Sequence, residues 1–394
     1  MVTYLLVILF VFSLLIYLII DYTGPKKILL EKDIVFNMKC MRAKDLMVQE
    51  YDNEGNLWAS RGLILYRLAR EDDKFVRMTR VPSGFSLFWL NSFSLFRKFT
   101  LRPECVEMTI ADSGAICAFS SGKMWIASVY TGKFHKTFTL PNYGFKVGRG
   151  IMSTGLARYN NGEFLIGEYF SNPDRTSVNI YRKVPGRMQW ETVYEFKKGQ
   201  IRHIHAIQSD PYTGKLWICT GDEDDEAMIG WSDDRFKSIN VIGSGSQVWR
   251  ACQLVFTEKA VFWGTDTGSE ELAGIYSWDK NTGNLSRLYK STGAIFFATV
   301  LDDGTIVMST DREGFPNEKD DKTRLLIIDK KGKVSTVICG TWNYKRHGFR
   351  FNFAKLRFQR NQNYDRLAVS VLNQEELPDG DMIIIDKGEL KAHT

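Results

Sequence analysis

A repeated unit of short strands is the feature that most constrains the fold of this chain. Each unit contains a buried strand that ends in small and acidic residues, then a second strand and a glycine-bearing hairpin. The clearest copies are Leu216 to Asp222, Val261 to Asp266 and Ile306 to Asp311. Self-similarity at a period of roughly 45 to 60 residues, carried by short strands, is typical of a β-propeller.

The repeat predicts an all-β propeller of seven four-stranded blades in one domain, residues 28–394. Splitting the chain is disfavoured, because each blade has an apolar face that only the next blade covers. The last unit has room for three strands, so residues 28–38 are predicted to add its outer strand and remove an open edge. The predicted blades begin near residues 45, 105, 150, 202, 249, 293 and 350.

The N-terminal segment is strongly apolar. Residues 4–20 contain Ser13 as their only polar interruption, and a helix of that length, slightly extended, crosses about 30 Å of hydrocarbon. The segment lacks the basic start and small-residue cleavage site of a signal peptide. Residues 1–24 are therefore interpreted as a retained single-pass transmembrane anchor, with a cleaved signal as the alternative.

The membrane side of the propeller is left open, with the cytoplasmic face favoured. Lys26 and Lys27 follow the apolar segment, and the positive-inside bias keeps such residues in the cytoplasm. The cysteines show no disulfide framework spacing, which agrees with a reducing compartment. The cysteines within apolar strand patterns are Cys117, Cys219, Cys252 and Cys339.

The charge of the chain does not indicate a nucleic-acid partner. It has 52 basic and 46 acidic side chains, a formal net charge of +6, and the basic residues are scattered rather than clustered. The slight excess of basic residues fits an anionic ligand or an anionic bilayer.

The functional site is expected at one mouth of the central channel, because that surface gathers side chains from every blade. If the innermost strands begin where the second strands end, the two sets of polar residues share this rim. Catalytic roles are predicted for Glu168, His205, Asp222, Asp266 and Asp311. Substrate contacts are predicted for Arg149, His203, Trp249, Arg250, Phe297 and Arg350.

Three kinds of chemistry are compatible with these residues. On a strand, His203 and His205 point to one face and could hold a metal with a carboxylate, or form a hydrogen-bonded or substrate-contacting pair. The carboxylates suit acid–base catalysis or turn capping. The arginines suit clamping an anion or pairing with the acids. No metal ligand is assigned, a divalent cofactor is left open, and the acidic run 223–226 is read as a solvated loop.

A second line of argument comes from a degenerate Asp-box. Ser232, Asp233 and Asp234 match its start, but Phe236 stands at its glycine position and Ile239 at its tryptophan position. With the flanking strands, this stretch resembles the sialidase-like, BNR-repeat propellers. The resemblance implies a propeller fold with a structural Asp-box, and a bias towards carbohydrate. Sialidase activity is not expected, because no Arg-Ile-Pro motif opens the first blade.

The function predicted from these observations is a membrane-anchored propeller that binds or processes an envelope polysaccharide or glycoconjugate at its central funnel. If the chain is an enzyme, the expected class is a glycoside hydrolase or polysaccharide lyase. A non-catalytic scaffold for a glycan or a protein is the first alternative. A calcium-dependent lactonase or esterase propeller is the second.

Overall fold

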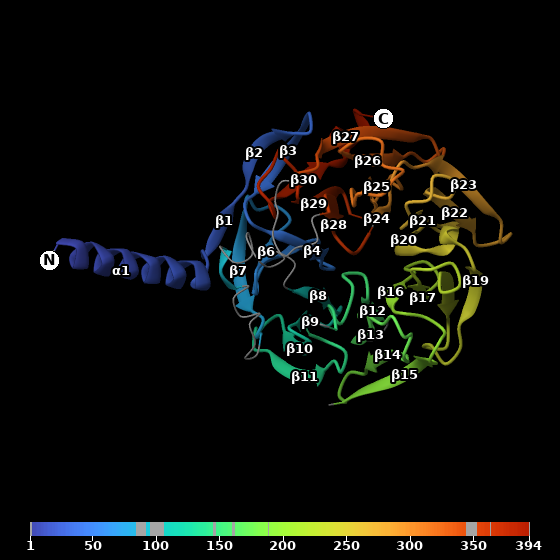
Figure 1. Cartoon of the computed structure of the whole chain (residues 1–394), viewed down its shortest axis with the longest axis horizontal. Coiled ribbons are helices and arrows are strands. Elements are labelled where there is room, and N and C mark those ends of the chain that lie inside the picture. Colours follow the sequence, from blue (N-terminus) through green and yellow to red (C-terminus); the bar gives the residue numbers. More distant parts are fainter. Residues whose placement is uncertain are drawn as a thin grey trace.

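The computed structural model describes residues 2–83, 92–94, 106–144, 147–159, 162–187, 189–343, 353–362 and 364–393, without the side chains of residues 2–7 and 9. The described strands form seven sheets arranged in a closed ring (Figure 1). The prediction of an all-β, seven-bladed propeller is thereby confirmed. The predicted site residue Arg350 lies outside the described residues.

Six blades follow one another along the chain, and each runs from an innermost to an outer strand. The first three contain β4 (Met47–Tyr51), β5 (Leu57–Arg61), β6 (Ile64–Leu68) and β7 (Lys74–Arg80); β8 (Glu107–Ile110), β9 (Ala115–Ser120), β10 (Lys123–Ser128) and β11 (His135–Thr139); and β12 (Leu156–Tyr159), β13 (Glu163–Gly167), β14 (Val178–Lys183) and β15 (Trp190–Phe196). The next three contain β16 (Ile204–Ser209), β17 (Leu216–Thr220), β18 (Met228–Ser232) and β19 (Asn240–Ser244); β20 (Ala251–Phe256), β21 (Ala260–Thr265), β22 (Gly274–Asp279) and β23 (Leu285–Lys290); and β24 (Ile295–Val300), β25 (Ile306–Thr310), β26 (Lys322–Ile328) and β27 (Val334–Thr341).

The last blade combines strands from both ends of the chain. It contains β28 (Lys355–Phe358), β29 (Arg366–Leu372) and β30 (Met382–Asp386), then β3 (Met38–Ala43) and β2 (Glu31–Val35). Strand β3 pairs with β30, and β2, which lies within residues 28–38, pairs with β3 as the outermost strand of this blade. Strand β1 (Lys27–Leu29) instead extends the first blade by pairing with β7. Short helices η3 (Gln247–Trp249) and α3 (Lys387–Lys391) complete the described elements.

The core lies between neighbouring blades. The second strands are buried almost along their whole length, as in β17, where all five residues are buried. Trp217 on β17 and Trp263 on β21 belong to one core cluster and are 2% and 0% exposed. Burying such a large aromatic side chain strongly stabilises the contact between blades. Because both faces of these strands are covered by neighbouring blades, their sequences are continuous apolar runs.

Several innermost strands contain a β-bulge near the channel. A bulge inserts one unpaired residue and redirects the side chains beside it. The bulge in β16 lies between Ile204 and Ala206, so His205 is the inserted residue. Comparable shifts of register occur in β4 between Val48 and Glu50, in β20 between Ala251 and Leu254, and in β24 between Ile295 and Phe297.

The degenerate Asp-box forms the hairpin between β18 and β19. The Asp234 carboxylate accepts hydrogen bonds from the Ser232 hydroxyl at 2.7 Å and from the Ser238 backbone N–H at 3.0 Å. Phe236 has a φ of 63° and is fully buried. A left-handed backbone favours glycine, so burial of the Phe236 ring offsets the strain of this conformation.

The N-terminal segment requires a correction. Helix α1 (Val2–Thr23) projects from the ring (Figure 1), but its last turn is fixed to the first blade. The buried carboxylate of Asp21 pairs with Arg61 at 3.0 Å, and the Arg80 guanidinium lies 4.0 Å from the centre of the Tyr22 ring. Within the described part of the chain, which excludes the side chains of residues 2–7 and 9, no helix is long and apolar enough to cross a bilayer. This finding overturns the N-terminal transmembrane helix predicted within residues 1–24 and the single-pass localisation.

Candidate functional site

The rim where the innermost strands begin also receives the ends of the second strands. We call this rim the upper mouth and define it by His203, His205, Asp222, Arg250 and Asp266. The two histidines lie at the start of β16, Asp222 follows β17, Arg250 precedes β20, and Asp266 follows β21. Antiparallel pairing of β16 with β17 and of β20 with β21 brings these five side chains together.

The two histidines face each other and share one carboxylate. The Nε2 atoms of His203 and His205 are 3.1 Å apart, and they lie 3.2 and 3.4 Å from the two oxygens of Asp222. His203 Nδ1 lies 3.2 Å from the carbonyl oxygen of Phe170, and the Tyr169 ring packs on the imidazole of His203 at 4.2 Å. Burial lowers the pKa of His205, because a low-dielectric site disfavours the imidazolium.

Arg250 joins the histidine cluster to the next blade. Its Nη2 lies 3.2 Å from Asp222 and 3.0 Å from Asp266, so one guanidinium bridges two carboxylates. Asp266 also accepts from the Cys252 thiol at 3.4 Å, and Cys252 Sγ lies 3.9 Å from His205 Nδ1. The five residues of the upper mouth therefore form one connected polar network.

Beside this network lie buried carboxyl oxygens that lack a hydrogen-bond partner among the described residues. They are both oxygens of Asp311, Oε1 of Glu313 and Oδ1 of Asp266. Burial raises the pKa of Asp311 well above its ordinary value. Burial, reinforced by the negative charge of Asp266, raises the pKa of Glu313 to about 8. Glu313 thus favours its protonated form at neutral pH.

The other predicted site residues lie in different surroundings. Glu168 is fully buried, and it accepts hydrogen bonds from the Asn179 backbone and side chain and from the Asn142 amide. Its carboxylate is therefore engaged within its own blade. Trp249 is partly buried and stacks on Trp263 at 5.5 Å, so its ring packs against the core. Arg149 and Phe297 line a small recess of about 10 Å³ together with Cys252 and Lys355.

The upper mouth opens into a rim pocket of about 740 Å³. The acidic run 223–226 forms part of this rim, but it is not a free solvated loop. Arg175 binds Asp225 at 2.7 Å and Glu226 at 2.8 Å, and Arg202 binds Glu223 at 3.2 Å. The pocket is lined by Arg202, Asp222, Glu223, Asp224, Asp225, Gln247, Arg250, Thr267, Gly268 and Phe315. Four acidic side chains against two basic ones do not favour an anionic ligand.

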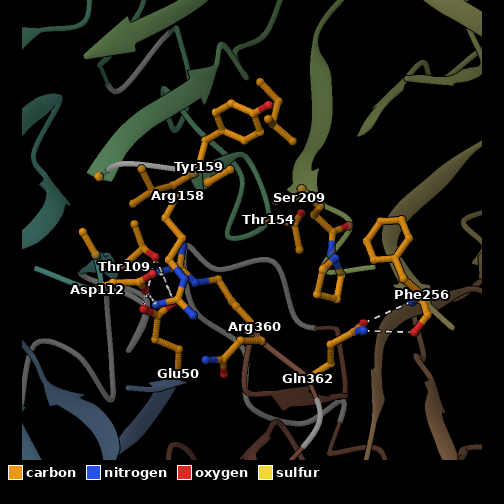
Figure 2. A pocket seen from close by; sticks show the side chains of 18 of the residues that line it. Glu50, Thr109, Asp112, Thr154, Arg158, Tyr159, Ser209, Phe256, Arg360 and Gln362 are labelled. Carbon is orange, nitrogen blue, oxygen red and sulfur yellow. Dashed lines mark hydrogen bonds and ion pairs between the residues drawn. The ribbon is translucent and has the colours of Figure 1, made fainter. Parts of the chain in front are cut away.

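A second pocket, of about 350 Å³, lies at the opposite end of the channel, which we call the lower mouth (Figure 2). It is lined where the innermost strands end, for example by Ser209 of β16 and Phe256 of β20. Its polar groups are largely paired, as Figure 2 shows for Gln362, whose amide exchanges hydrogen bonds of 2.9 and 3.1 Å with the backbone of Phe256.

Sequence reasoning missed Glu313 and Cys252 as members of the upper mouth. Cys252 lies two residues after the predicted Arg250, inside an irregular part of β20, so its orientation could not be read from strand alternation. Glu313 follows the repeat's terminal acid, Asp311, by two residues. That position was a usable signal, because a segment leaving the same strand end stays near the same rim.

Comparison with known proteins places the chain among β-propellers. No family model matches it, and no curated protein matches it either. Among solved structures, an oligogalacturonate lyase from Vibrio parahaemolyticus has a TM-score of 0.60 at 10% identity, covering 91% of this chain and 96% of that one. U3-55K has a TM-score of 0.51 at 14% identity, covering 89% and 98%.

A structure from a study of two prolyl endopeptidases has a TM-score of 0.51 at 11% identity. The match covers 86% of this chain but only 47% of that chain, so this protein spans about half its length. At such identities the likeness shows the fold alone. The three proteins differ in function, as expected of a fold that hosts many unrelated activities.

Proposed function

We propose that this propeller binds a carbohydrate in the rim pocket of the upper mouth and cleaves it by acid–base catalysis. The observation that carries the proposal is the group of buried carboxyl oxygens without partners on Asp266, Asp311 and Glu313. Unpaired buried polar groups are rare in folded proteins and need a reason. None of the three residues lines the rim pocket, so a ligand rich in hydroxyl groups would have to reach past Arg250, which lines the pocket and pairs with Asp266, to supply the missing hydrogen bonds.

The carboxyl groups support different roles. Glu313 has a pKa raised to about 8 and would act as the general acid that protonates the leaving oxygen. Asp266, in an ion pair with Arg250 at 3.0 Å, would act as the base. Carboxyl groups whose environments differ in this way are the usual arrangement for glycoside cleavage. The acidic lining favours a neutral or amino sugar over the anionic ligand expected from the sequence.

The carbohydrate class rests on two weaker supports. The Asp-box hairpin resembles that of BNR-repeat propellers, and one of the similar structures is an oligogalacturonate lyase. Neither identifies the sugar, and lyase chemistry requires a uronate substrate. A hydrolase acting on a neutral or amino-sugar glycan fits the charges of the rim pocket better than a lyase does.

The test is a substrate panel of neutral, amino-sugar and uronate oligosaccharides, with reducing ends measured for hydrolysis and unsaturated products for elimination. We expect hydrolysis of a neutral or amino-sugar member and a loss of at least about 100-fold in kcat for Glu313→Gln. Glu195→Gln is the matched control, because Glu195 is an exposed residue of β15 that pairs with Lys197. Binding without turnover by the wild-type protein would contradict the enzyme and favour the scaffold.

A further inference from the structure

Three potential ligand side chains converge at the upper mouth. The Nε2 atoms of His203 and His205 are 3.1 Å apart, and each faces one oxygen of the Asp222 carboxylate, Oδ2 at 3.2 Å from His203 and Oδ1 at 3.4 Å from His205. Two imidazole nitrogens bound to one divalent ion at about 2.1 Å are separated by roughly 3.0 to 3.4 Å in octahedral or tetrahedral geometry. The observed spacing is the spacing that a shared ion requires.

The hydrogen bond of His203 supports the same reading. Its Nδ1 faces the carbonyl oxygen of Phe170, which can only accept, so Nδ1 carries the proton. In a neutral ring the Nε2 lone pair then points towards His205. Metal-bound histidines commonly donate their other nitrogen to a backbone carbonyl in this way. An ion between the two nitrogens would satisfy both lone pairs together.

The surroundings of the cluster supply a carboxylate ligand and hold the histidines in place. Asp222 contacts both imidazoles at 3.2 and 3.4 Å, and Asp266 is paired with Arg250 at 3.0 Å. His203 and His205 are only 6% and 1% exposed, so their positions are fixed by packing. Asp222 lines the rim pocket, so the third ligand also faces the pocket where a substrate would enter.

We propose that His203, His205 and Asp222 bind one divalent transition-metal ion, with a coordination position open towards the rim pocket. Two imidazoles and one carboxylate are the ligands of zinc, manganese or ferrous iron rather than of calcium, which prefers oxygen ligands. The ion would lie beside the proposed acid and base and could polarise a substrate oxygen. The site itself does not depend on the carbohydrate proposal.

A second set of atoms offers a competing site. His205, Cys252 and Asp266 also lie within 4.8 Å of one another through one ligand atom each. All three of these side chains are buried, whereas Asp222 in the first set is partly exposed. The first set is therefore the one with access to the pocket, and Cys252→Ser distinguishes the two.

The experiment measures metal binding by the full chain after treatment with a chelator. Isothermal titration with Zn²⁺, Mn²⁺ and Ca²⁺ should give one equivalent of Zn²⁺ or Mn²⁺ and at least 100-fold weaker Ca²⁺. The Co²⁺-loaded protein should show the visible absorption of a nitrogen-ligated ion. His203→Ala and Asp222→Asn should each weaken binding at least about 100-fold, since each removes a ligand. His135→Ala, at an exposed position on β11, should bind as the wild type does.

Several results would overturn the proposal. One is the absence of stoichiometric binding of any transition metal by the folded protein. Another is unchanged affinity in Asp222→Asn, which keeps the size of the side chain and so tests the ligand even if His203→Ala does not fold. Loss of binding in Cys252→Ser with retention in His203→Ala would assign the ion to the second set. Metal binding without sugar cleavage would leave this site standing and contradict the proposed function alone.

Discussion

The two mouths of the channel are built from the same strands but treat their polar groups in opposite ways. At the lower mouth, Glu50 accepts hydrogen bonds from the Thr109 hydroxyl and the Ile110 backbone N–H at 3.1 and 2.6 Å, and Arg158 donates to the Ile110 carbonyl at 2.7 Å. At the upper mouth, neither carboxyl oxygen of Asp311 has a hydrogen-bond partner among the described residues. The lower mouth uses its acids to connect blades, whereas the upper mouth leaves one buried carboxyl group unpaired beside its network.

This contrast shows that the presence of charged residues does not by itself identify the functional end of the channel. Arg360 is the main exception to the pairing of polar groups at the lower mouth. Its Nη1 donates to the Ser153 carbonyl at 3.1 Å, but its Nη2 lies 3.7 Å from Glu50, too far for a hydrogen bond. Between the mouths, Arg357 and Glu107 form a bidentate pair from β28 and β8 with distances of 3.1 and 2.6 Å. We therefore expect substitutions at the paired positions to change stability and substitutions at the upper mouth to change activity.

The largest expected effect is that of Arg357→Ala. The change leaves the buried Glu107 carboxylate without its cation, and breaking a buried ion pair costs about 3 to 5 kcal/mol of unfolding free energy. Urea denaturation followed by circular dichroism measures the loss. Arg70→Ala is the control, since Arg70 is exposed and its pair with Asp365 should be worth less than about 1 kcal/mol. Equal losses in the two variants would contradict the distinction.

The next effect concerns pH and the upper mouth. The folded-state pKa of Glu313 is about 8 against an ordinary value of 4.5, so the folded protein keeps a proton that the unfolded chain releases at lower pH. Its contribution to stability is present below pH 4.5 and is lost as the pH rises through about 8. Denaturation at several pH values should show this loss in the wild type and a flatter profile in Glu313→Gln. The charged groups acting on Glu313 are Asp266, Lys355, Arg250 and Glu318, and Glu313 in turn raises the pKa of Asp311.

A profile for Glu313→Gln as steep as that of the wild type would remove Glu313 as the source of the pH dependence. It would also weaken its assignment as the general acid, because a carboxyl group with an ordinary pKa is ionised at neutral pH.

The smallest expected effect is that of Gln362→Ala at the lower mouth. The substitution removes two hydrogen bonds to the Phe256 backbone and should lower the unfolding free energy by about 1 to 2 kcal/mol. Metal binding and sugar cleavage should be unchanged. A loss of either activity with retained stability would show that the lower mouth, too, takes part in function.

The architecture could be predicted because the repeat records it directly. Four second strands, β13, β17, β21 and β25, are largely buried and are followed by an acid at the rim, as Asp222 and Asp266 show, so the shared rim follows from strand direction. Strand alternation predicted that His203 and His205 lie on one face. The β-bulge at His205 sets the final orientation of its side chain, and a bulge of this kind cannot be predicted from residue type. Trp249 shows the limit in the other direction, because its ring stacks on Trp263 against the core.

Glu168 shows a second limit of prediction from the sequence. It follows β13 at the position equivalent to Asp222 and Asp266, yet Asn179 and Asn142 bind its carboxylate. The two asparagines are 11 and 26 residues away along the chain, and a sequence pattern does not show which of several nearby amides a buried acid will meet. The Asp-box resemblance stays a prediction, although Asp234 does bind the backbone of its hairpin.

The shared last blade also imposes an order on assembly. Strand β3 can form its pairing with β30 only after β30 has been synthesised. The ion pair of Arg42 with Asp381 likewise joins positions 339 residues apart. Contacts of such long range form late and slow the search for the native state. During synthesis the early blades therefore form an open arc whose strand β3 has an unpaired edge. That edge stays unpaired until β30 is made and closes the ring.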